Sequence, residues 1–84
     1  MDGQYWSLNV QHKPQRTLEQ ARELHSFLQE ALVPDKHLRP GQKLIVNLTK
    51  TRPDLWQQVG NTQLDCFYDD ALMWGTIQWI RDNW

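Results

Sequence analysis

Apolar and polar side chains alternate near the start of the chain and predict a β-strand over residues 5–10. Trp6, Leu8 and Val10 fall on one side of an extended backbone, and the residues between them fall on the other. A period of two is typical of a strand with one buried face. We therefore expect the fold to open with a strand.

The next stretch has a period of three to four residues, which predicts an amphipathic helix. Thr17 and Gln20 have the spacing of a capping box, in which each side chain accepts a hydrogen bond from the backbone N–H of the other residue. Apolar residues then recur at helical spacing from Leu18 to Leu32. Pro34 cannot continue the hydrogen-bond ladder, so the helix should end before it.

Two further alternating stretches predict a second and a third strand. Residues 43–49 are rich in β-branched and apolar side chains, with Leu44, Val46 and Leu48 on one face. Residues 62–68 alternate in the same way. A short helix is expected between these two strands.

The signals for that short helix lie at both of its ends. Thr51 is a capping residue, Pro53 suits a first turn, and Asp54 suits the positive end of a helix. Gly60 is suited to end the helix in the left-handed conformation. The segment between these signals is about two turns long and carries the apolar residues Leu55, Trp56 and Val59.

The C-terminal segment, residues 69–83, fits two patterns. As a helix it places Met73, Ile77 and Ile80 on one narrow stripe. As a strand it uses the extended preference of the sequence TIQWI, with a hairpin turn at the two aspartates before it. Gly75 and Thr76 weaken a helix, so the strand is the favoured interpretation.

The predicted fold class is therefore α+β, a two-layer sandwich in the order β-α-β-α-β-β with both helices on one face of the sheet. A helical C-terminal segment would change the order to β-α-β-α-β-α. In the sandwich, Trp79 points into the core, whereas Phe67 and Trp74 face the uncovered side of the sheet. The other expected core residues are Trp6, Leu28, Leu44, Val46, Leu48 and Leu64.

Length and composition indicate one domain over residues 1–84, because two separate cores could not both be filled in a chain of 84 residues. The chain shows no signal-peptide pattern and no apolar run long enough to span a membrane. Its single cysteine, Cys66, excludes an intrachain disulfide. These features predict a cytoplasmic protein without a membrane partner.

The sequence carries no motif that predicts catalysis, a cofactor or a metal. Cys66 follows Asp65, whose negative charge opposes the low pKa that a reactive thiol needs. The spacings of 13 and 12 residues that separate His12, His25 and His37 match no compact zinc motif. The aspartates of DCFYDDAL lack the glycine-containing loop of a calcium or magnesium site. We therefore expect a protein that is not an enzyme.

Charge and aromatic content indicate a protein-binding role instead. Residues 1–53 hold eight Lys/Arg against five Asp/Glu, whereas residues 54–84 hold one Arg against five Asp. The acidic part also contains most of the tryptophans, a residue type enriched at binding hot spots. The main hypothesis is a small adaptor or inhibitor, of the kind that phages and mobile elements encode, that binds a basic protein surface. Its expected contact residues are Phe67, Asp69, Asp70 and Trp74.

The alternative hypothesis is a domain that binds single-stranded nucleic acid. Aromatic side chains on the sheet would stack on bases, and Lys43, Lys50 and Arg52 would contact phosphates. The net charge of −1 and the isoelectric point near 6.2 weigh against this alternative. An exposed sheet edge would also permit association of identical copies.

Overall fold

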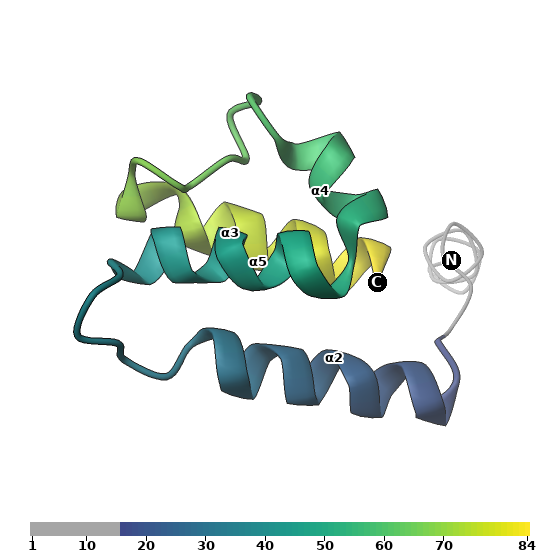
Figure 1. The fold of residues 1–84 in the computed structure, drawn as a ribbon. Helices are drawn as coiled ribbons and strands as arrows, with labels where there is room; N and C mark the ends of the chain where they lie inside the picture. Colours follow the sequence, from purple (N-terminus) through teal and green to yellow (C-terminus); the bar gives the residue numbers. More distant parts are fainter. Residues whose placement is uncertain (1–15) are drawn as a thin grey trace, which may run out of the picture.

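The computed structural model describes residues 16–84, which form four α-helices and one 3₁₀ turn (Figure 1). The elements are α2 (Leu18–Ala31), α3 (Pro40–Thr51), α4 (Pro53–Val59), η1 (Asp70–Leu72) and α5 (Met73–Asn83). No strand occurs within residues 16–84, so the predicted α+β sandwich is wrong. The strand predicted over residues 5–10 lies outside the described residues, as does Trp6.

Helix α3 is the centre of the fold, since it contacts α2, α4, α5 and η1. Figure 1 shows α2 lying along one side of α3 and α5 and running antiparallel to α3, while α4 lies on the opposite side. The core formed between these elements consists of Leu24, Phe27, Ala31, Leu44, Ile45, Leu48, Leu55, Val59, Cys66, Ile77 and Ile80.

Helix α2 begins as its capping box predicts. The Thr17 side chain accepts a hydrogen bond from the Gln20 backbone N–H at 3.1 Å, and the Gln20 side chain accepts one from the Thr17 N–H at 2.8 Å. The last helical residue is Ala31, ahead of Pro34. The sequence therefore predicted this helix correctly.

The prediction of a strand over residues 43–49 is wrong, because these residues belong to α3. The buried positions Gly41, Leu44, Ile45 and Leu48 follow spacings of three and four residues, which form one face of a helix. Burial of that face outweighs the extended preference of the β-branched residues. Val46 consequently points away from the buried stripe and is half-buried.

Helix α4 confirms the predicted short helix but differs at both ends. Arg52, not Thr51, occupies the N-cap position. Gly60 has a φ of −57°, and the left-handed conformation falls one residue later at Asn61, with a φ of 63°. Leu55 and Val59 are buried, as a helix packed on α3 requires.

Residues 62–68 form turns instead of the predicted third strand. The Asp65 carboxylate accepts backbone hydrogen bonds from Asn61 at 3.0 Å and from Phe67 at 3.1 Å, and the Thr62 hydroxyl donates to the Val59 carbonyl. Such local side-chain bonds satisfy backbone groups that a strand would pair with a neighbour. Leu64, expected in the core, is half-buried.

The C-terminal segment is helical, so the alternative interpretation is correct for these residues. Thr76, Ile77 and Ile80 form the buried face of α5. The Asp69 carboxylate accepts a hydrogen bond from the Ala71 N–H at 3.0 Å and caps η1, where a hairpin turn was predicted. Trp79 is half-buried.

Candidate interaction surface

The segment of residues 64–72 contains Phe67, Asp69 and Asp70 of the predicted contact residues. It is fixed against the beginning of α3. One Asp70 carboxylate oxygen accepts hydrogen bonds from the Gly41 backbone N–H at 2.9 Å and from the Arg39 guanidinium at 3.1 Å. Arg39 also donates to the Phe67 carbonyl at 2.6 Å. Arg39, the N-cap residue of α3, makes no side-chain cap bond of its own. Asp70 therefore caps this helix from a distant part of the chain.

The backbones of α3 and this segment approach each other closely at Gly41. A Cβ atom on Gly41 would lie 2.3 Å from the Cys66 carbonyl oxygen and 2.7 Å from the Asp70 carboxylate. Because no side chain fits in that space, glycine is required at this position for steric reasons. The approach places the Cys66 thiol 3.5 Å from the Gly41 carbonyl oxygen, to which it donates.

Cys66 has the environment of a structural thiol. Its side chain is completely buried, and burial raises the pKa of the thiol. A nucleophilic cysteine requires the opposite shift and access to a substrate. Cys66 is therefore part of the buried core.

Thr76 attaches the same segment to α5. Its hydroxyl is buried and donates to the Leu72 carbonyl at 3.0 Å and toward the Leu64 carbonyl. Hydrogen bonds from α3 and from α5 thus hold the segment from both sides, which fixes its backbone relative to the core.

Two large aromatic side chains extend from this fixed region into solvent. Tyr68 is 86% exposed and Trp74 is 76% exposed. The Phe67 ring packs edge-on against the Tyr68 ring, with 4.7 Å between the centroids. Trp74 lies in the first turn of α5, whose buried face is formed by other residues. We call Phe67, Tyr68, Asp69 and Trp74 the aromatic surface.

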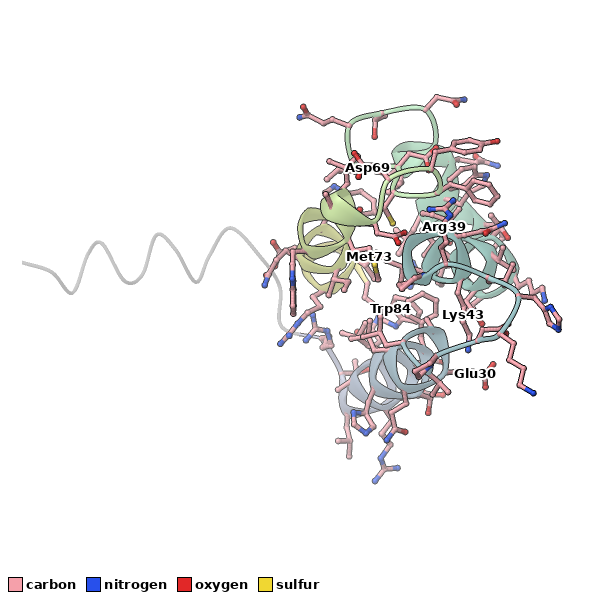
Figure 2. All side chains as sticks on the ribbon, turned by 90° about the vertical axis from the view of Figure 1, so that its left-hand side faces the viewer. Glu30, Arg39, Lys43, Asp69, Met73 and Trp84 are labelled. Carbon is pink, nitrogen blue, oxygen red and sulfur yellow. The ribbon has the colours of Figure 1, made fainter. Side chains whose placement is uncertain are left out.

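The predicted contact residues differ in how accessible their side chains are to a partner. Asp69 is exposed (Figure 2), whereas Asp70 is engaged with Arg39 and Gly41. Tyr68 was missed because the predicted strand assigned it to the same face as the core residues Leu64 and Cys66. Its position next to two aspartates in DCFYDDAL was the available sign of exposure.

Two of the three basic residues of the alternative hypothesis are bonded to other parts of the fold. Lys43 donates to the Val33 carbonyl at 2.6 Å and so holds the connection between α2 and α3. Arg52 forms a two-bond salt bridge with Asp54, at 2.9 and 2.8 Å, and lies 4.9 Å from the centroid of the Trp84 ring. Lys50 is exposed in the last turn of α3. Two of the three cations therefore have structural roles.

Within residues 16–84, no group of three His, Cys, Asp or Glu side chains is arranged to hold a metal ion. His25 and His37 are exposed, on α2 and on the following connection, and His12 lies outside the described residues. None of the helices in this part of the chain is both long and apolar enough to cross a membrane.

Comparisons with known proteins give no relative from which a role could be transferred. No protein-family model matches the chain, and searches of curated proteins and of solved structures found no similar protein.

Proposed function

We propose that this protein is a non-catalytic interaction module that binds a protein partner through the aromatic surface. The observation that carries the proposal is the 76% exposure of Trp74 on a helix whose buried face is formed by other residues. Tryptophan is costly to leave in water and is among the residue types most enriched at binding hot spots.

The arrangement of α5 separates the folding role of this helix from the proposed binding role. Thr76, Ile77 and Ile80 pack into the core, so the helix does not need Trp74 for its own attachment. Tyr68 is still more exposed and also lies outside the core. Both aromatic side chains are therefore available to a partner without any rearrangement of the fold.

The fixed backbone between these residues favours binding. Asp70 and Arg39 hold this segment against α3, and the Thr76 hydroxyl, which donates toward the Leu64 carbonyl, holds the residues before it against α5. A surface whose backbone is already ordered loses less conformational entropy on association than a loose loop does. Preorganisation of this kind suits a small module with few contact residues.

The charge of the surface favours a basic partner. Asp69 is exposed, and its carboxylate forms no ion pair within residues 16–84. Asp70 contributes less negative potential because Arg39 lies 3.1 Å away. A partner with an apolar pocket bordered by Lys or Arg would match this combination of aromatic and acidic groups.

Two observations weigh against the nucleic-acid alternative. It required aromatic residues on a sheet between basic residues, and no strand occurs within residues 16–84. Lys43 and Arg52, two of its three proposed phosphate contacts, hold other parts of the fold.

Site-specific crosslinking in the native host tests the proposal. Trp74 is replaced by p-benzoylphenylalanine, and the control places the same probe at Leu18, which is 69% exposed on α2. We expect one protein to crosslink from position 74 and not from position 18, and to form a complex with the unmodified chain after purification. Crosslinks to nucleic acid, or the same set of proteins from both positions, would contradict the proposal.

A further inference from the structure

A concave region separate from the aromatic surface lies between α2 and the ends of α3 and α5. It is a groove of about 500 Å³ that none of the aromatic-surface residues lines. Phe27 and Trp84 contribute its aromatic part, with ring centroids 5.0 Å apart. Figure 2 shows Trp84 between α2 and the helices above it. The groove is therefore a separate feature with an aromatic base.

The α2 wall of the groove is acidic. Glu19, Glu23 and Glu30 all line it, and their spacings of four and seven residues place them on one side of the helix. Their backbone positions span about 16 Å at 1.5 Å per residue. None of the three carboxylates forms an ion pair within residues 16–84. Glu23 lies near the charge of Arg52 without a salt bridge to it, so all three carboxylates remain available to an external cation.

The cations of the lining offset this row only in part. Arg52 lines the groove, but its guanidinium is paired with Asp54 and lies over the Trp84 ring. The hydrogen bonds to Asp54 raise the pKa of Arg52, and the nearby charge of Glu23 raises it further. Arg22, on α2 itself, is the other cation of the lining, so two arginines stand against three glutamates and Asp54. The groove therefore has an excess of negative charge beside an aromatic base.

We infer that this groove binds a cationic segment of another protein, with Lys or Arg side chains directed at the α2 carboxylates. The length of the acidic row matches about three helical turns or five extended residues of such a segment. A polyphosphate backbone would be repelled by the same carboxylates, so a basic polypeptide is the occupant that the charges select.

Trp84 provides a reporter for occupation of the groove. Its buried indole N–H has no hydrogen-bond partner within residues 16–84, which is uncommon for a buried donor. The indole N–H resonance in a ¹H–¹⁵N spectrum is therefore sensitive to any change in its surroundings. A segment seated between α2 and α3 would shift this resonance together with the amides of the acidic row.

The test titrates the ¹⁵N-labelled full chain with a nona-arginine peptide at about 50 mM salt, where charge interactions are weakly screened. The double variant Glu23→Gln, Glu30→Gln removes two groove carboxylates. The control double variant Asp35→Asn, Asp82→Asn makes the same change in total charge at residues that line neither the groove nor the aromatic surface. We expect binding about fivefold weaker in the groove variant and less than about twofold weaker in the control.

The inference is supported if the resonances of the Trp84 indole N–H and of the α2 amides shift and saturate. This result is expected in the original chain and in the control variant. Equal weakening by both variants, or shifts spread over the whole surface, would overturn it. A dimer of the free protein that the groove variant dissociates would also overturn it, because a second copy would then fill the groove. The Trp74→Ala variant should bind the peptide normally, so this test is independent of the aromatic surface.

Discussion

The Cys66 carbonyl oxygen lies so close to Gly41 that a Cβ atom there would be only 2.3 Å away. This approach brings the beginning of α3 against a segment that is distant in the sequence, and Asp70 adds the hydrogen bond that caps the helix. This contact fixes the backbone that carries Phe67, Tyr68 and Asp69 of the aromatic surface. Variants of Gly41 and Asp70 measure how much stability the contact provides.

Gly41→Ala should reduce the free energy of unfolding by about 3 kcal/mol or more, since backbone must move to accept the methyl group. Gly75→Ala is the matched control on α5, where the nearest atom to an added Cβ is a Leu64 methyl at 4.0 Å. This control should gain about 0.5–1 kcal/mol from improved helix propensity. Urea denaturation of both variants measures the difference, and equal effects would refute the close approach.

Asp70→Ala should cost about 1–2 kcal/mol, because it leaves the Gly41 N–H and the Arg39 guanidinium without their acceptor. Asp70→Asn keeps an oxygen for the Gly41 N–H and should recover most of that loss, since the exposed ion pair itself contributes little. Thermal unfolding of the two variants separates these contributions. An Asp70→Ala protein as stable as the original chain would remove Asp70 from its capping role.

Cys66→Ala should cost about 1–2 kcal/mol through the loss of a small buried side chain. Burial raises the pKa of this thiol above its ordinary value of 9.0. As pH rises, the thiol therefore loses its proton at a lower pH in the unfolded chain than in the folded one. The stability due to the neutral thiol is complete below pH 9.0 and is lost as pH rises through the pKa of the folded protein.

The measurement is the free energy of unfolding between neutral pH and pH 10 for the original chain and for Cys66→Ala. The original chain should lose more stability over this range than the variant does, because only it carries the buried thiol. Parallel curves, or rapid reaction of the folded protein with a thiol reagent at neutral pH, would contradict the burial of Cys66.

The elements that the sequence predicted correctly are those with local signals. Thr17 and Gln20 lie three residues apart and specify the start of α2 without help from the rest of the chain. Pro53 and Asp54 do the same for α4. In each case the residues that start the helix belong to its first turn or to the cap beside it.

The start of α3 could not be predicted in this way, because its cap comes from Asp70 and its close packing from Cys66. The alternation of Leu44, Val46 and Leu48 then suggested a strand. The spacing of Gly41, Leu44 and Leu48 was the helical signal within the same stretch, but it becomes decisive only when the partners of Gly41 are known.

The candidate surface was predicted in part, for a reason that proved wrong. Trp74 was placed on the open face of a sheet, and it is exposed in the first turn of α5, outside the buried stripe of that helix. Asp70 was expected to contact a partner, whereas its carboxylate caps α3. A single sequence shows that a carboxylate is present but not which distant N–H it will meet.

The binding proposal depends most on Trp74, so the affinity of Trp74→Ala for the crosslinked partner, measured by calorimetry beside its thermal midpoint, tests it most directly. We expect binding to weaken by about 2 kcal/mol or more while the free energy of unfolding changes by less than about 0.5 kcal/mol. Full affinity in the folded variant would contradict the proposed surface, and a loss of stability like that caused by truncating buried Ile80 would show that Trp74 belongs to the core.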